Sequence, residues 1–118
     1  MLAADINPLD KLVYVPKYYL YGSDLPTKLI IPDHIKLINE AAFEKCKNLT
    51  ELILPKSLTA IKEYAFCGCK NLKTVRYLGT VEDWKYNVYL EDYNGDKQTQ
   101  FWLCPANKII CSDGFINI

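Results

Sequence analysis

The chain has 118 residues, half of them hydrophobic, and this length and composition suit one domain with a continuous core. Its 14 basic residues balance 14 acidic residues, so no overall field favours nucleic acid or an anionic membrane surface as a partner. The segment Met1 to Pro8 lacks the basic start and apolar run of a signal peptide, and no later run is long enough to span a membrane. We therefore expect a cytoplasmic protein, or one of the host cytoplasm or virion if a phage encodes it, with no nucleic-acid or membrane partner.

The first 28 residues precede the regular part of the sequence. Residues 1–12 contain Pro8 and little periodicity, and we expect them to cap the open edge of the first layer. Residues 13–28 predict a shortened first repeat. Their Val13–Pro16 stretch has the strand-and-proline pattern of the later repeats, and Leu20 falls where Phe66 falls.

Two full repeats of 23 residues follow, residues 29–51 and 52–74, and they align without a gap. Such a period indicates stacked units that cannot bury their apolar sides alone. Each unit predicts an alternating strand that ends at a proline, which has no N–H to donate to the ladder. A second extended piece, a single helical turn from Asn39 to Cys46 that places Ala42 and Phe43 inside, and a Lys-Asn turn complete the unit.

Residues 75–118 predict a diverged repeat and a C-terminal cap. Thr80 and Asp83 have the spacing of a capping box, which predicts a helix over Val81–Asn87 with Trp84 in the slot of Ile38 and Ile61. Asn94-Gly95 predicts a β-hairpin. Residues 109–111 predict a last strand, and Asp113-Gly114 a final turn.

The repeats resemble the BspA-type leucine-rich repeat. Within the repeats the resemblance rests on the pattern L-x-I-P, followed by an apolar residue three places on, isoleucine at plus six, Ala-Phe, cysteine and Lys-Asn-Leu. It also rests on two closing stretches, Tyr77–Trp84 and Ile110–Ile116. It covers about residues 13–84 and 109–116. The resemblance implies the family's fold and a tendency towards protein contacts, and it implies nothing catalytic.

These elements predict a single repeat domain over residues 1–118, and together with the resemblance they imply a leucine-rich-repeat solenoid, a β-rich α/β class. We expect about three and a half coils of 23 residues, with parallel stacked strands, short helical turns and a C-terminal cap that contains a hairpin.

The five cysteines include no C-x-x-C pair, and with His34 as the single histidine we expect no zinc site. Cys46 and Cys69 share one repeat slot, so stacking permits either a disulfide or two buried free thiols. We expect free thiols, because parallel side chains in a ladder rarely meet disulfide geometry. Cys67 is expected at the surface, where Lys70 is the one nearby base that would lower its pKa.

Calcium-like spacing at Asp92, Asn94 and Asp96 is explained by the predicted hairpin turn, since Gly95 is misplaced for a calcium loop and no bidentate glutamate follows. His34 has no nucleophile in a shared motif, and we expect it to be a solvated surface residue. We therefore expect no cofactor and no enzymatic activity.

Strand alternation predicts a protein-binding surface. If Leu29, Leu52 and Val75 point inward, then Tyr14, Ile30, Ile53 and Arg76 point outward, in one row along the stack. We expect a module that docks on another protein to scaffold or block it, for example a phage-encoded inhibitor of a host protein. The simpler interpretation is that these are ordinary surface residues, or residues that the chain's own termini cover.

The alternative function is a structural or assembly subunit, a virion accessory or surface-assembly protein that forms a homo-oligomer. Its contact would be the aromatic C-terminal face, which holds Tyr86, Tyr89, Tyr93, Phe101 and Trp102.

Overall fold

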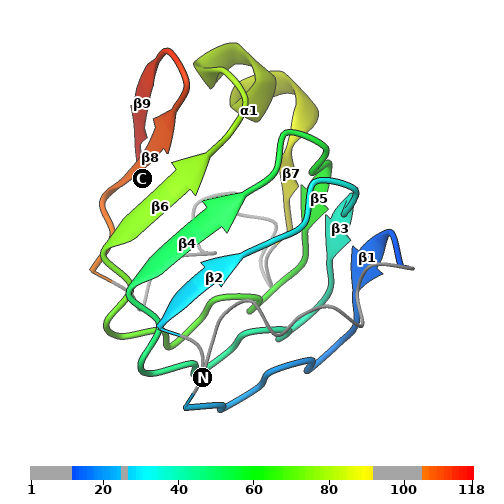
Figure 1. Ribbon diagram of the computed structural model, residues 1–118, viewed down its shortest axis with the longest axis vertical. Helices are drawn as coiled ribbons and strands as arrows, with labels where there is room; N and C mark the ends of the chain where they lie inside the picture. The colour runs from blue at the N-terminus through cyan, green and yellow to red at the C-terminus, as the bar shows by residue number, and fades with distance from the viewer. Residues whose placement is uncertain (1–11, 25–26, 92–104) are drawn as a thin grey trace.

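The computed structural model describes residues 12–24, 27–91 and 105–118. These residues form two sheets on opposite sides of one hydrophobic core (Figure 1). The first sheet has the order β1-β3-β5-β7, with strands Tyr14–Val15, Leu37–Ile38, Ala60–Ile61 and Tyr89–Leu90. The second has the order β2-β4-β6-β8-β9, with strands Lys28–Ile30, Glu51–Leu54, Thr74–Tyr77, Lys108–Cys111 and Gly114–Asn117.

Parallel pairing between successive repeats follows the period of the sequence. Leu29 lies opposite Leu52, and Leu52 lies opposite Val75, so equivalent positions of neighbouring repeats face each other. Their side chains are fully buried, whereas the intervening Ile30 and Arg76 are exposed. The predicted class is confirmed at this level: the described residues are strand-rich, with parallel sheets and one short helix.

The segments that connect the second strand of a repeat to the next repeat are successive turns, and the predicted helical turn at 39–46 is wrong. Ala41 and Lys45 have φ angles of 55° and 60°, a left-handed conformation that interrupts a right-handed helix. With the chain in this conformation, alternate backbone N–H groups point to the next layer. Phe43 donates to the carbonyl of Ala65, as Leu20 donates to Ala42. Ala42 and Phe43 are buried, as predicted.

The first repeat begins differently from the prediction. Tyr14 pairs with Leu37 and Val15 with Ile38, so Val13–Pro16 belongs to the β1-β3-β5-β7 sheet. The proposed equivalence of this stretch to Leu29–Pro32 is therefore wrong. The match of Leu20 to Phe43 and Phe66 is confirmed, because their backbone hydrogen bonds are equivalent. Both observations have one cause, the 23-residue period: Val15 precedes Ile38, with which it pairs, by 23 residues, and Leu20 precedes its equivalent Phe43 by 23 residues.

Aromatic and thiol side chains fill the interior between the sheets. The rings of Phe43 and Phe66 stack with centroids 5.3 Å apart and an angle of 12° between their planes. The Cys46 thiol donates to the carbonyl oxygen of Leu20 at 3.1 Å, and the Cys69 thiol donates to that of Phe43 at the same distance. Each buried thiol thus reaches back to the preceding repeat, and the four cysteines that the structure describes are free. Cys104 lies outside the described residues.

Helix α1 spans Val81–Asn87, as predicted, and Thr80 and Asp83 form the predicted capping box. Trp84 is buried against the Tyr77 ring, with centroids 5.1 Å apart, but it does not occupy the slot of Ile61. Leu90 of β7 pairs with Ile61 instead, because helix α1 adds an excursion before the chain rejoins that sheet. Within the described ranges, no helix has the length and hydropathy needed to cross a membrane.

The last strand of the prediction is confirmed as β8, and an additional strand, β9, pairs with it in an antiparallel hairpin. The turn consists of Ser112 and Asp113, and Gly114 is the first residue of β9. The predicted Asn94-Gly95 hairpin and the calcium-like stretch lie outside the described residues, as do residues 1–11 of the predicted N-terminal cap.

Tyr77 provides a test of the packing between β6 and α1. Its hydroxyl is buried and has no hydrogen-bond partner among the described residues, and burial raises its pKa. An unsatisfied buried hydroxyl costs about 1 to 3 kcal/mol. We expect Tyr77→Phe to raise the free energy of unfolding by about 1 kcal/mol in urea denaturation, because the ring stays and the penalty disappears. Tyr86→Phe, at a highly exposed position, should leave it unchanged. A less stable Tyr77→Phe would show that the hydroxyl is satisfied.

Candidate protein-binding face

The outward side chains of the five-stranded sheet form a continuous row. Ile30 lies opposite Ile53, Ile53 opposite Arg76, and Arg76 opposite Ile110. Across the terminal hairpin Ile110 lies opposite Phe115, whose side chain is 57% exposed. Neighbouring strands are about 4.8 Å apart, so these five side chains form one stripe across the sheet. We call this set, Ile30, Ile53, Arg76, Ile110 and Phe115, the outer row.

Three of the four residues predicted for partner binding belong to the outer row, and Tyr14 does not. Tyr14 lies on β1, opposite Leu37, at the edge of the other sheet. The prediction placed it in the row because Val13–Pro16 has the same apolar-and-proline pattern as Leu29–Pro32. Its side chain is 41% exposed, on a face that the outer row does not reach.

Ile110 and Phe115 were missed by reasoning from the sequence. Strand alternation could have predicted an outward position for Ile110, since it alternates with buried Ile109 and Cys111. A two-residue turn after Cys111 would have placed Phe115 opposite Ile110. Ile110 lies 34 residues beyond Arg76, its neighbour on the next strand, so the 23-residue period does not indicate the pairing.

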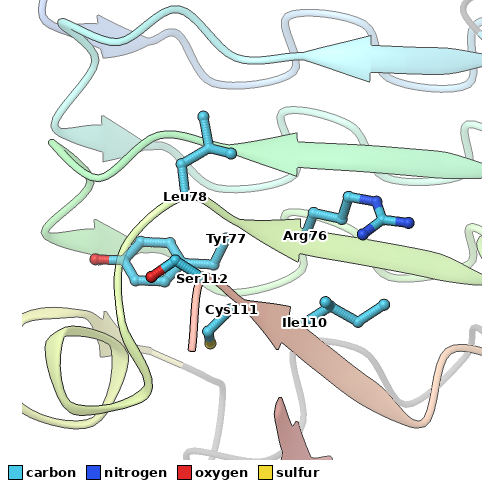
Figure 2. Close-up of a pocket in the computed structure, with 6 residues that line it drawn as sticks. All are labelled: Arg76, Tyr77, Leu78, Ile110, Cys111 and Ser112. Atoms are coloured by element: carbon cyan, nitrogen blue, oxygen red, sulfur yellow. The ribbon is translucent and has the colours of Figure 1, made fainter. Parts of the chain in front are cut away.

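A pocket of about 210 Å³ adjoins the outer row where β6 and β8 separate. Figure 2 shows the Arg76 and Ile110 side chains extending in the same direction from neighbouring strands, with the Tyr77 ring on the opposite side. Leu78 and Ser112 complete the lining together with Cys111. The strands separate because the chain leaves Tyr77 for helix α1, and beyond this point the Ser112 N–H donates to the Gly79 carbonyl. An arginine beside aliphatic side chains and a recess is typical of the anchoring region of a protein interface.

Two charged groups, Arg76 in the outer row and Lys108 beside it, make exposed contacts. The Arg76 Nε lies 3.4 Å from Glu51 Oε2, a contact in which both side chains remain partly exposed to solvent. The Lys108 ammonium lies 4.9 Å from the centroid of the Phe115 ring. Exposed ion pairs contribute about 0 to 1 kcal/mol and exposed cation–π contacts about 0.5 to 1 kcal/mol, so neither group is held in place strongly. Both remain available to a partner.

Burial raises the pKa of each cysteine for which a shift is resolved. Burial raises the pKa of Cys46 to about 11. It also raises the pKa of Cys67, where Glu44 adds to the effect and Lys45 opposes it. Cys67 is half-buried, not exposed as predicted, and the nearby base is Lys45, not Lys70. Burial, with Asp113, raises the pKa of Cys111 as well. A nucleophilic cysteine needs a lowered pKa, so these thiols are poor nucleophiles at neutral pH.

Metal binding and histidine chemistry have little support in the described part of the chain. No group of three His, Cys, Asp or Glu side chains within it could hold a metal ion. His34 is partly exposed, with its Nδ1 4.0 Å from the Asp33 carboxylate. Of the aromatic C-terminal residues, Tyr86 on α1 and Tyr89 on β7 are exposed. Tyr93, Phe101 and Trp102 lie outside the described residues.

Comparison with known proteins agrees with the repeat pattern. The family model for the BspA type leucine rich repeat region, with six copies, matches residues 4–95. No curated protein and no solved structure gives a significant match. The matched segment contains both full repeats and continues beyond helix α1. The chain therefore belongs to the BspA-type leucine-rich repeat family.

Proposed function

We propose that the chain is a protein-docking module, built as a leucine-rich-repeat solenoid of about three and a half coils, whose outer row binds a partner protein. The family suggests protein interaction and is typically non-enzymatic. The observation that carries the proposal is the continuity of the outer row over five neighbouring strands. Isolated apolar surface residues are ordinary, whereas a continuous apolar stripe with arginine and an aromatic residue resembles an interaction site.

Two further features support docking on this face. The pocket beside Arg76 provides a recess for a partner side chain. The backbone below the centre of the row is fully paired, since β4, β6 and β8 each have a neighbouring strand on both sides. Such a face is suited to scaffolding the partner or to blocking its surface. An inhibitor would act by blocking the partner's surface.

The test changes the centre of the row without changing the core. We expect Ile53→Asp with Arg76→Glu to keep the melting temperature within a few degrees of the parent, since both side chains point outward. The same variant should weaken partner binding at least about a hundredfold, because it places carboxylates at the centre of an interface. Proteins captured by the immobilised parent are identified by mass spectrometry, purified, and measured for affinity.

A matched control has the same change in net charge on the other sheet. Tyr14→Asp with Lys36→Glu alters two exposed residues near β1 and β3 and should bind the partner like the parent. If this control loses binding and the Ile53→Asp/Arg76→Glu variant keeps it, the partner docks on the β1-β3-β5-β7 sheet and the proposal is wrong.

A further inference from the structure

Basic side chains are gathered along one edge of the proposed docking face. The strands β2, β4, β6 and β8 are parallel, so they all begin at the same edge of the sheet. Lys28 and Lys108 are the first residues of β2 and β8, and Lys73 directly precedes β6. The turns that lead to β4 and β6 add Lys47 and Lys70, which occupy equivalent repeat positions. We call these five lysines, Lys28, Lys47, Lys70, Lys73 and Lys108, the basic rim.

Among residues 12–24, 27–91 and 105–118, few acidic side chains oppose the basic rim. Asp24 lies 3.4 Å from the Lys47 ammonium, and Glu51 is already paired with Arg76. Lys28, Lys70 and Lys73 have no carboxylate within salt-bridge distance in the part of the chain that the structure describes. The whole chain carries as many acidic as basic residues, so this excess of positive charge is local. A local field of one sign selects partners of the opposite sign.

The apolar outer row runs beside the basic rim, on the same face of the same strands. Ile30 lies two residues after Lys28, and Ile110 lies two residues after Lys108, so their side chains project from the same side. Nucleic acid would use the lysines through its phosphates but would leave Ile30, Ile53 and Ile110 without apolar contacts. A protein surface with apolar residues flanked by carboxylates complements both features.

We infer that the partner presents an acidic, amphipathic segment, with its apolar side chains on the outer row and its carboxylates on the basic rim. This inference rests on the proposed function and specifies the chemistry of the partner. The outer row crosses five strands and is about 19 Å long at about 4.8 Å per strand. A helical segment of about 13 residues has the same length, at about 1.5 Å per residue.

The test is a selection of random 16-residue peptides displayed on phage against the immobilised parent, followed by affinity measurements on synthetic copies. We expect the enriched peptides to combine Asp or Glu with apolar residues. Their affinity should fall about tenfold or more between 50 and 500 mM salt, because exposed charge pairs are screened. Enrichment of neutral or basic peptides, or of none, would overturn the inference.

Paired charge-reversal variants locate the contact. Lys70→Glu with Lys73→Glu should lower the affinity for the enriched peptides about tenfold or more. Lys36→Glu with Lys85→Glu, which makes the same change in net charge outside the basic rim and the outer row, should have little effect. If the rim variant binds like the parent while Ile53→Asp does not, the inference fails and the proposed function stands. If both variants bind the peptides like the parent, the inference and the proposed function both fail.

Two other occupants are distinguished by direct measurement. A 20-base-pair DNA duplex that binds at 150 mM salt, with its affinity lost in Lys70→Glu/Lys73→Glu, would identify nucleic acid and overturn the inference. A parent that is dimeric by light scattering, and an Ile53→Asp variant that is monomeric, would identify a second copy and likewise overturn it. A monomeric parent with no duplex binding, together with enriched acidic peptides, supports the inference.

Discussion

Phe66→Ala is expected to lower the free energy of unfolding by about 3 to 5 kcal/mol, by loss of apolar transfer energy and creation of a cavity. Phe66 is fully buried and stacks on Phe43 of the preceding repeat. A domain of this size has a total stability of about 5 to 15 kcal/mol, so the variant would be marginally folded. The measurement is urea or thermal denaturation followed by circular dichroism.

Two control substitutions distinguish the loss of packing volume at the buried position 66 from the loss of a phenylalanine ring as such. Phe66→Leu introduces the residue type that the first repeat has at the equivalent position, Leu20. It should lower the free energy of unfolding clearly less than Phe66→Ala, because most of the side-chain volume is kept. Phe115→Ala removes an exposed ring and should cost about 0.5 kcal/mol or less. An unchanged melting curve for Phe66→Ala would contradict the observed stacking of the repeats.

Gly79→Ala is expected to lower the free energy of unfolding by about 1 to 3 kcal/mol or more, because the added methyl group would overpack the core. A Cβ at this position would lie 2.6 Å from the nearest atom of the Tyr77 ring. The ring cannot easily move aside, since it is almost completely buried and packs against Trp84. Thermal and urea denaturation of the variant measure the loss.

A double-mutant cycle shows whether the ring causes the loss. In a Tyr77→Leu background the methyl group meets no ring, and Gly79→Ala should then cost much less. Gly114→Ala is the matched control, because its Cβ would meet only Val81, at an ordinary 3.4 Å, and it should be nearly neutral. An equal cost of Gly79→Ala in both backgrounds would show that backbone strain, and not Tyr77, limits this position.

The inner surface of the second sheet could be predicted from the sequence because it depends on local alternation and on a constant period. Leu29, Leu52 and Val75 alternate with less buried residues and recur every 23 residues, so each occupies an equivalent buried position. Helix α1 was also predictable, since the capping box of Thr80 and Asp83 acts within four residues. Cys46 and Cys69 share one repeat slot, and free, buried thiols were expected there because parallel side chains in a ladder rarely meet disulfide geometry.

The turns between Asn39 and Cys46 could not be predicted from residue type alone. Ala favours a right-handed helix, yet Ala41 is left-handed because this conformation lets backbone N–H groups bond to the next repeat. Tyr18 and Tyr64 have the same left-handed φ at equivalent positions, although tyrosine has no intrinsic preference for it. Hydrogen bonding between layers therefore determined a backbone conformation that the local sequence opposes.

The sequence by itself determined the repeats, the core slots, helix α1 and three residues of the outer row, Ile30, Ile53 and Arg76. The 23-residue period also places Tyr14 opposite Leu37, on the other sheet, although the strand-and-proline pattern of Val13–Pro16 suggested otherwise. Only the tertiary structure decided that Leu90 and not Trp84 follows Ile61, and that Ile110 and Phe115 extend the row. The physical reason is that strand pairing is a contact between distant segments. Where an insertion such as helix α1 changes the interval between strands, the period no longer specifies which residues meet, and hydrogen bonding together with burial selects the register.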